Sequence, residues 1–133
     1  MRKIRSLEME RQNISSGVKF EDLVGYSRAV KIGNQIFVSG TTGVDYADSK
    51  SPPDAYSQAK KAIENIDATL RKLGSSLGDV VRTRVFIRSD VGWEDVAKAH
   101  VEAFSKVRPA STMLSAGFLD PRILVEIEAD AVV

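Results

Sequence analysis

The segment between Pro53 and Gly74 sets the strongest constraint on how this chain can fold. Its apolar residues recur at steps of three and four, which places them on one stripe of a helix. They are Ala55, Ala59, Ala62, Ile63, Ile66, Leu70 and Leu73. Proline is tolerated where a helix begins, and glycine commonly follows its end. The pattern predicts an amphipathic helix from Asp54 to Leu73 that must cover an apolar surface.

Strand patterns on both sides of this helix supply such a surface. The range 26–39 reads as a β-hairpin in which Gly33-Asn34 is the two-residue turn. Its strands are Ser27–Ile32 and Gln35–Ser39. Residues 45–53 are polar and hold two prolines, which predicts a loop into the helix. Residues 80–88 (VVRTRVFIR) are β-branched and alternating, and predict a further strand.

A second helix and two more strands complete the chain. The helix is expected over 92–106, before Arg108-Pro109 interrupts it. Its expected apolar face holds Trp93, Val96, Ala97, His100, Val101 and Phe104. Strands are expected at Ser111–Phe118 and Ile123–Val133, with a turn at Leu119–Pro121 between them. In the last strand Ile123, Val125, Ile127, Ala129 and Ala131 share one face, and Glu126, Glu128 and Asp130 share the other.

The order of elements predicts a single α+β domain over residues 1–133. It reads β-β-α-β-α-β-β, with one more short edge strand at the start if Ile4–Met9 pairs, and a turn at Asn13–Gly17. Two helices can cover only one face of such a sheet, so something else must bury the other. The simplest candidate is another copy of the same chain.

Composition narrows the function further. The chain has 133 residues, 43% of them apolar, and a net charge of +1 with no clustered basic stretch, which argues against nucleic-acid binding. It has no cysteine, so disulfides, a thiolate nucleophile and Cys-ligated zinc are excluded. No signal peptide or membrane span is visible, so the expected address is the cytoplasm. One histidine leaves little for a metal site or a serine triad, and no phosphate-binding glycine motif is present.

Two polar residues stand out, each with two readings. His100 is either a buried histidine held by a hydrogen bond or a cleft residue that binds ligand or moves a proton. Glu126 is either one of three acids on a polar strand face or a carboxylate that orients a water. The sequence leaves both alternatives open.

Several motifs resemble one family when taken together. They are Gly25-Tyr-Ser-Arg-Ala-Val30, Gly33-Asn34, Phe37-Val-Ser-Gly40, Gln58, Asp79-Val-Val-Arg-Thr83, Arg108-Pro-Ala-Ser-Thr112 and Val125-Glu-Ile-Glu-Ala129. From about Asn13 to the C-terminus the chain is similar to the Rid/YjgF family of reactive-intermediate deaminases, parts of which carry the description endoribonuclease L-PSP. The resemblance implies a chorismate-mutase-like fold: a six-stranded mixed sheet with two helices on one face, assembled into a homotrimer.

The resemblance also implies an activity. Active members hydrolyse reactive imines and enamines, such as 2-iminobutyrate, in clefts between subunits, and need no metal or organic cofactor. Tyr26 matches the cleft tyrosine, Ser39 and Gly40 match the turn that lines the cleft, and Glu126 matches the glutamate that orients the water. In a trimer, Tyr26 of one chain is expected to face Ser111 and Glu126 of the next.

One departure from the family pattern bears on the substrate. Deaminating members carry an arginine directly after Pro-Ala, where it clamps the substrate carboxylate, and this chain has Ser111 there. Thr112 follows it in the expected cleft. Arg28 or Arg108 could supply the missing cation, and His100 could enter the cleft. Alternatively, Arg28 points to solvent and Arg108 caps the second helix.

Two functions therefore stay open. The first is a cofactor-free imine or enamine deaminase, or a related hydrolase whose substrate lacks a carboxylate, with Glu126, His100 and Tyr26 as catalytic residues. Its substrate-binding residues would be Arg28, Ser39, Gly40, Arg108, Ser111 and Thr112. The second is a trimer that binds a small metabolite, such as an imine or small carboxylate, or a protein partner in the same clefts without chemistry, which the missing arginine favours. RNA cleavage has been attached to parts of the family, and the near-neutral charge argues against it here.

Overall fold

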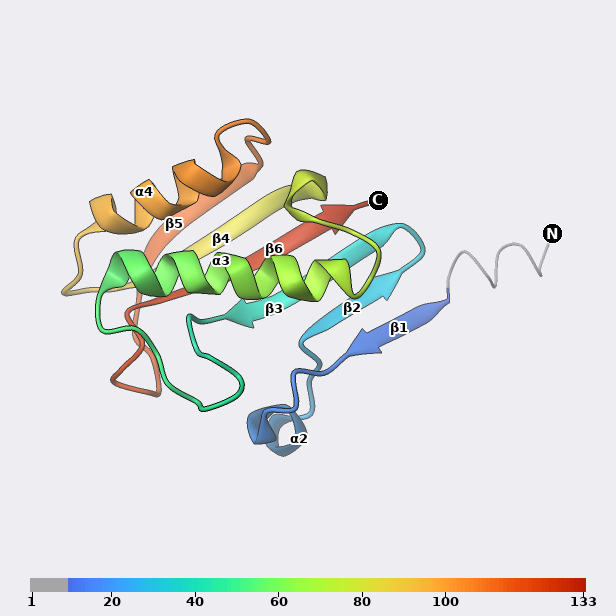
Figure 1. The fold of residues 1–133 in the computed structure, drawn as a ribbon, viewed down its shortest axis with the longest axis horizontal. Coiled ribbons are helices and arrows are strands. Elements are labelled where there is room, and N and C mark those ends of the chain that lie inside the picture. The colour runs from blue at the N-terminus through green and yellow to red at the C-terminus, as the bar shows by residue number, and fades with distance from the viewer. Residues whose placement is uncertain (1–9) are drawn as a thin grey trace.

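The computed structural model describes residues 10–133, which form a six-stranded sheet in the order β1-β2-β3-β6-β4-β5 (Figure 1). The strands are β1 (Arg11–Ile14), β2 (Ala29–Ile32), β3 (Gln35–Thr41), β4 (Val80–Arg88), β5 (Ala110–Ala116) and β6 (Val125–Val132). The helices are α2 (Lys19–Val24), α3 (Ala55–Arg71), the 3₁₀ turn η1 (Leu77–Asp79) and α4 (Trp93–Phe104). Only β4 and β5 pair in parallel, because α4 carries the chain back between them; all other pairs are antiparallel.

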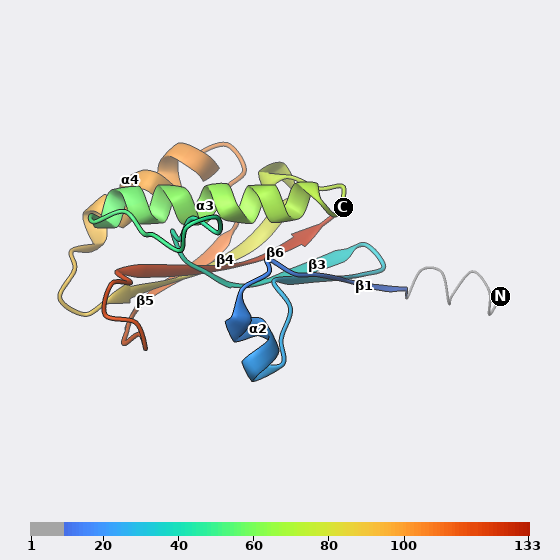
Figure 2. The same cartoon turned by 60° about the horizontal axis from the view of Figure 1, so that its bottom comes forward.

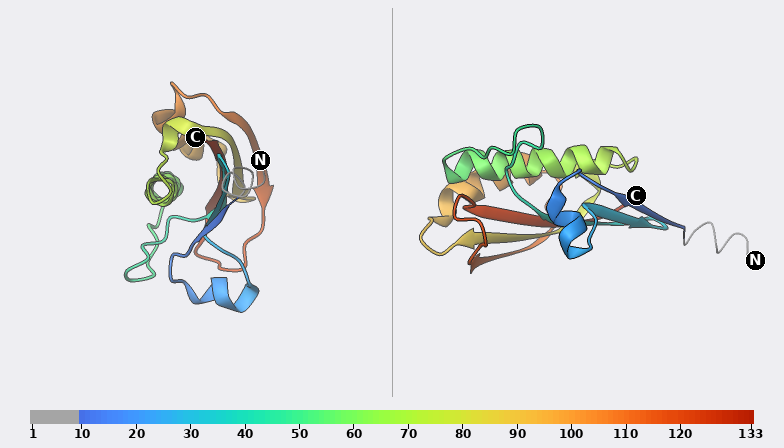
Figure 3. Two further views of the ribbon diagram at one scale, coloured as in Figure 1. Left: turned by 90° about the vertical axis from the view of Figure 1, so that its right-hand side faces the viewer. Right: turned by 90° about the horizontal axis from the view of Figure 1, so that it is seen from below.

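The long helices α3 and α4 cover one face of the sheet, and the short helix α2 projects on the other side (Figure 2). Figure 3 shows the same layers from two further directions. We call the face covered by α3 and α4 the helix face and the opposite one the open face. All seven residues of the apolar stripe on and just after α3 are buried against the sheet, which confirms the predicted amphipathic helix.

Buried polar side chains fix α3 to the loops around it. Gln58 donates from Nε2 to the carbonyls of Pro52 (2.7 Å) and Arg122 (2.9 Å) and accepts from the amide of Leu124 (2.9 Å). Asn65 donates to the carbonyls of Thr42 and Val44, just after β3. Because these amides satisfy backbone groups that no strand satisfies, they hold the ends of β3 and β6 in register with the helix.

Much of the predicted architecture is confirmed. Strand β4 spans the predicted 80–88, and the hairpin turns at Gly33, whose φ of 58° is in the left-handed region that glycine tolerates. Asp54 is the N-cap of α3, where its side chain accepts from the amide of Ser57. The inward residues of β6 are all buried, as their alternation predicts. Strand β5 begins at Ala110, one residue before the prediction, and ends at Ala116.

Other predictions need correction. Residues 11–14 form β1, so the expected turn at 13–17 begins only after Ile14, and α2 was not predicted at all. The possible strand at Ile4–Met9 lies outside the described residues. On α4, Trp93 and Val101 are each 60% exposed, and Ala99 lies in the core instead. The buried face of α4 is therefore narrower than expected.

The open face carries both charges and large apolar side chains. Arg84 lies 3.5 Å from carboxylate oxygens of both Glu128 and Asp130. Phe37 and Leu114, which pair with open-face positions of β6 and β4, are 44% and 43% exposed. In the described part of the chain, no helix is long and apolar enough to cross a membrane. A mixed face of this kind is what a protein–protein contact buries.

Candidate functional site

An irregularity in β3 shapes the first group of polar residues. Val38 pairs with Ala129 and Thr41 with Ile127, so three steps along β3 match two along β6, and Ser39-Gly40 forms a bulge. The Ser39 hydroxyl donates to the carbonyl of Ser27 at 2.7 Å, which fastens the bulge to the start of β2. Bulges re-aim backbone groups, and this one faces the side chain of Glu126.

The Glu126 carboxyl packs directly on Gly40. A Cβ atom at Gly40 would stand 2.6 Å from Oε1 and 2.8 Å from Cδ of Glu126, closer than any non-bonded contact allows. Glu126 is half-buried, and this burial raises its pKa above the usual value; Arg28 opposes the rise, and Glu128 adds to it. The carboxyl is therefore a stronger base than an exposed glutamate and lies in a defined place.

Arg28 is the cation whose charge lowers the pKa of this carboxyl. Its side chain is only 6% exposed, and its Nη2 donates to the carbonyl of Gly40 at 2.5 Å. Its Cζ lies 5.8 Å from the centre of the Tyr26 ring, while its buried Nε has no partner within residues 10–133. Burial raises the pKa of Tyr46, and Arg28 opposes that rise. Arg28 thus links the bulge, two tyrosines and Glu126 electrostatically.

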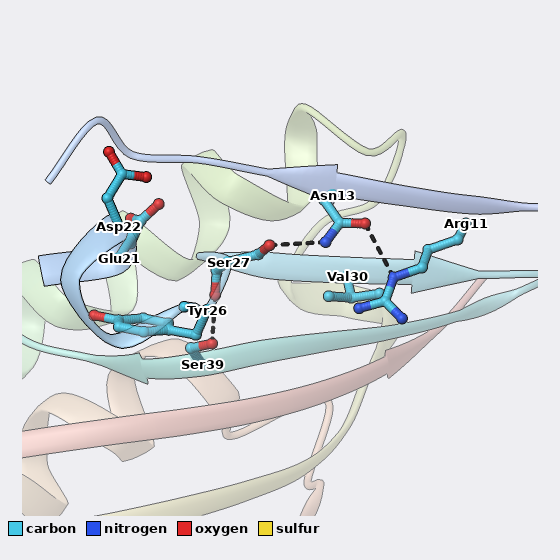
Figure 4. Close-up of a pocket in the computed structure, with 9 residues that line it drawn as sticks. Arg11, Asn13, Glu21, Asp22, Tyr26, Ser27, Val30 and Ser39 are labelled. Atoms are coloured by element: carbon cyan, nitrogen blue, oxygen red, sulfur yellow. Dashed lines mark hydrogen bonds between the residues drawn. The ribbon is translucent and has the colours of Figure 1, made fainter. Parts of the chain in front are cut away.

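A pocket of about 470 Å³ opens beside this group, between the open face and α2 (Figure 4). Tyr26 and Ser39 line it, together with a polar ladder in which Arg11 donates to Asn13 and Asn13 donates to the Ser27 hydroxyl at 2.8 Å. Its remaining lining includes Glu21, Asp22, Gly25 and Val30. Burial works against the charge of Glu21, but hydrogen bonds from Ser16 and Ser15 outweigh it and lower its pKa. The pocket therefore has a fixed polar wall.

A second group lies on the helix face at the sheet edge. Thr83 on β4 is fully buried, and its hydroxyl lies 2.9 Å from Nε2 of His100 and 2.8 Å from the hydroxyl of Ser111. His100 on α4 is half-buried, with its ring centre 4.7 Å from that of Phe104. Burial lowers the pKa of His100, which favours the neutral ring. Ser111 is exposed, so one end of the group meets the surface.

Most of the predicted site residues thus fall into two groups in one chain, and Thr83, which was not predicted, joins the second. The open-face cluster is Tyr26, Arg28, Ser39, Gly40 and Glu126; the edge cluster is Thr83, His100 and Ser111. Glu126 pairs with Phe86, whereas Ser111 pairs with the inward-facing Thr83, so the two side chains leave the sheet on opposite faces. The expectation that Ser111 and Glu126 form one chain's side of the cleft therefore needs correction: Glu126 belongs with Gly40.

Two predicted residues stand apart from both clusters. Arg108 has a φ of 50° and donates its amide to the carbonyl of Phe104 at 2.8 Å, so its backbone caps α4, and its side chain is exposed. Thr112 is exposed and pairs with Arg84, which places it on the open face beside β4. Sequence reasoning did not select Thr83 or Tyr46. Thr83 carried a signal, since it is the polar residue at an inward position of an otherwise apolar alternation.

Fold and site together define an α+β chain with both long helices on one face and two separate polar clusters. Residues 17–133 match the family described as Endoribonuclease L-PSP. The chain belongs to this family, which is also called Rid/YjgF. Within residues 10–133, no group of three or more His, Asp or Glu side chains is placed to hold a metal ion.

Relatives and solved structures agree with this assignment. An uncharacterized protein of Streptomyces coelicolor is 34% identical over 121 residues, which cover 90% of each chain. The 2-iminobutanoate/2-iminopropanoate deaminase of Escherichia coli K12 is 32% identical over 111 residues, covering 80% of this chain and 86% of that one. The crystal structure of a YjgF-family protein from Mycobacterium tuberculosis superimposes with a TM-score of 0.85 at 42% identity, covering 93% of this chain and all of that one.

Proposed function

We propose that the protein is a homotrimer with a reaction cleft between each pair of neighbouring subunits. The open-face cluster of one subunit would form one wall of the cleft and the edge cluster of its neighbour the other. Two observations support this arrangement. The clusters leave the sheet on opposite faces, so one chain alone cannot bring them together. The exposed apolar side chains of the open face, Phe37 and Leu114 among them, need a partner surface.

The proposed reaction is the hydrolysis of a reactive imine, or of an enamine after it tautomerises to the imine. Water adds to the imine carbon while Glu126 takes one of its protons, and the nitrogen receives a proton. The C–N bond then breaks, leaving a carbonyl compound and ammonia. Glu126 is suited to the first step because burial raises its pKa and Gly40 fixes its place. Tyr26 and the Ser39-Gly40 bulge would position the substrate beside it.

The single observation that carries the proposal is the contact between Gly40 and the Glu126 carboxyl. A half-buried carboxyl held against an irregular strand, beside a buried arginine, is costly to stability and is typical of a functional site. The relatives named as deaminases give the chemistry its direction.

The direct test is ammonia release from imines generated in the assay by an amino-acid or amine oxidase. The panel should contain both imino acids and imines without a carboxylate. The wild-type protein should accelerate release, and Glu126→Gln should lose about a hundredfold of the rate while keeping the mass of a trimer. No acceleration with any imine, or equal rates for the two proteins, would refute the deaminase.

A non-catalytic function is the second candidate, because Ser111 stands where the family resemblance implies an arginine that holds the substrate carboxylate. In that case the same clefts would bind a metabolite without turnover. A metabolite library would then raise the melting temperature of both the wild type and Glu126→Gln to a similar degree. Turnover that depends on Glu126 excludes this alternative.

A further inference from the structure

The edge cluster contains two side chains that the proposed water addition does not use. Thr83 and His100 come from β4 and α4, and they lie in line behind the exposed Ser111. Both O–O and N–O separations, 2.8 and 2.9 Å, are ordinary hydrogen-bond lengths, so the three side chains form one continuous chain of hydrogen bonds. Thr83 is fully buried, and its hydroxyl bonds to the side chains of both His100 and Ser111. Its hydroxyl therefore joins a buried residue to an exposed one.

The hydrogen bonds of this chain can run in two directions, because each hydroxyl has one proton and the role of His100 Nε2 depends on its tautomer. In the Nε2–H tautomer His100 donates to Thr83 and Thr83 donates to Ser111, which leaves the Ser111 proton free to point outward. In the Nδ1–H tautomer the order reverses, and the Ser111 oxygen is left to accept. Only in the first direction is the exposed end of the chain a hydrogen-bond donor whose orientation is fixed from inside the protein.

The edge cluster is also uncharged. In the described residues no Lys, Arg, Asp or Glu side chain hydrogen-bonds to Ser111, Thr83 or His100. Burial favours the neutral imidazole. A carboxylate that leaves water needs a cation or several donors in return, and one neutral hydroxyl is a poor substitute. A carbonyl of an amide or ester needs only one donor, which is what Ser111 offers when His100 is in the Nε2–H tautomer.

We propose that Ser111, held by Thr83 and His100, determines substrate specificity by donating one hydrogen bond to an uncharged carbonyl group of the substrate. The edge cluster thereby selects imines with a neutral amide or ester where relatives take a carboxylate. This inference rests on the proposed cleft. Ser111 touches the ligand, and Thr83 and His100 are positioning residues that act through it.

The single histidine makes a direct binding test possible, because the untagged protein gives one set of imidazole NMR signals. The probes are pyruvamide and pyruvate, stable analogues of the two kinds of product that differ in the charged group. Titration of the wild type should shift the His100 signals, with pyruvamide binding at least fivefold more tightly than pyruvate. The ring should be in the Nε2–H tautomer.

Matched variants separate the hydrogen-bond chain from packing. Thr83→Val keeps the shape of the buried side chain, removes its hydroxyl and should weaken pyruvamide binding about fivefold, the value of one neutral hydrogen bond. Thr83→Ser should restore most of it. Ser111→Arg should reverse the preference toward pyruvate. Thr69→Val removes another buried hydroxyl, which bonds only to the carbonyl of Asn65, and should leave binding unchanged.

The proposal is overturned if pyruvate binds the wild type as tightly as pyruvamide, if neither probe binds, or if Thr83→Val binds pyruvamide like the wild type. Ammonia release is measured separately. Preferential pyruvamide binding without turnover of any imine would refute the deaminase and leave the specificity assignment standing. Turnover of imino acids, together with tighter binding of pyruvate than of pyruvamide, would support the deaminase and refute the specificity assignment.

Discussion

The carboxyl of Glu126 and the α-carbon of Gly40 lie so close that a single methyl group on Gly40 would stand 2.6 Å from the Glu126 oxygen. The two residues come from paired strands, β6 and β3, at the point where their register slips. Because Gly40 has no side chain, the acid can pack on the bulge, whose Gly40 carbonyl also accepts a hydrogen bond from Arg28. The position of the proposed base therefore depends on a glycine.

Gly40→Ala should separate function from stability. The Glu126 carboxyl is the flexible end of a side chain and can rotate away at a cost of about 1 kcal/mol. Its displacement should still lower the rate of imine hydrolysis by about a hundredfold. Urea unfolding and initial rates measure the two effects. A variant with wild-type turnover would show that the place of the carboxyl is unimportant.

Gly43→Ala, three residues further along, should lower the stability of the fold far more than Gly40→Ala does. A Cβ atom there would meet the backbone of α3, 2.5 Å from the carbonyl oxygen of Gln58, and a helix backbone cannot rotate away. We expect a loss of about 2 to 3 kcal/mol in the free energy of unfolding. Equal stability of the Gly40→Ala and Gly43→Ala variants would contradict the packing described here.

Glu126→Gln should stabilise the subunit while it lowers the rate of turnover about a hundredfold. Because burial raises the pKa of Glu126 in the folded state, the folded protein holds this proton more firmly than the unfolded chain. The contribution of Glu126 to stability therefore falls as the pH rises above the ordinary value of 4.5 through the raised folded value. The melting temperature of the variant should exceed that of the wild type near neutral pH, and the difference should shrink in acid. A wild type that is more stable at neutral pH would refute this.

Arg28→Met should move the acid limb of the pH–rate profile. Arg28 lowers the pKa of Glu126, so without its charge the carboxyl takes up a proton at higher pH and the rate of hydrolysis falls earlier as the pH decreases. The profile of kcat/KM measures this shift. Arg71→Met, which removes an exposed arginine on α3, is the control and should leave the profile unchanged. If the acid limb of the Arg28→Met profile lies at the same pH as that of the wild type, Arg28 does not influence the pKa of Glu126.

His100 should make the protein less stable in mild acid. Its pKa is lowered in the folded state by burial, so below the ordinary value of 6.5 the unfolded chain binds the proton more readily. The stability that comes from the neutral ring is present above 6.5 and is lost as the pH falls through the lowered value. Urea unfolding at about pH 7.5 and about pH 5.5 should show a smaller difference for His100→Gln than for the wild type. An equal difference would indicate an unperturbed histidine.

Regular patterns in the sequence were enough to predict the elements that build the core. The stripe on α3 and the alternation in β4 and β6 each have a clear period, and burial follows it. The two segments whose apolar residues follow no regular spacing, α2 and β1, were not predicted. Helix α2 has six residues and buries only Glu21, a carboxyl, while β1 exposes three of its four residues. Hydrogen bonds to neighbouring strands and to Ser15 and Ser16 hold these segments, and no sequence pattern reports such contacts.

The sequence named candidate residues for the site but not their arrangement. Alternation within a strand fixes the face of a residue such as Glu126. The resemblance placed Glu126 beside Ser111 and opposite Tyr26 of the next chain, whereas in the structure Glu126 packs on Gly40. The side on which Ser111 emerges depends on the parallel pairing of β5 with β4, which sets it opposite Thr83. Pairing between strands is a property of the tertiary fold, so the connection from Ser111 to His100 became visible only in the structure.

The central claim is that each cleft joins the open-face cluster of one subunit to the edge cluster of its neighbour, and mixed trimers test it most directly. Glu126→Gln damages only the first cluster, and Ser111→Trp blocks only the second at an exposed position. Each variant alone should be inactive. Co-expressed in equal amounts, they should recover about a quarter of the wild-type rate, because that share of clefts in a random cyclic trimer draws both walls from undamaged clusters. Activity no greater than the sum of the two separate variants would contradict a site shared between subunits.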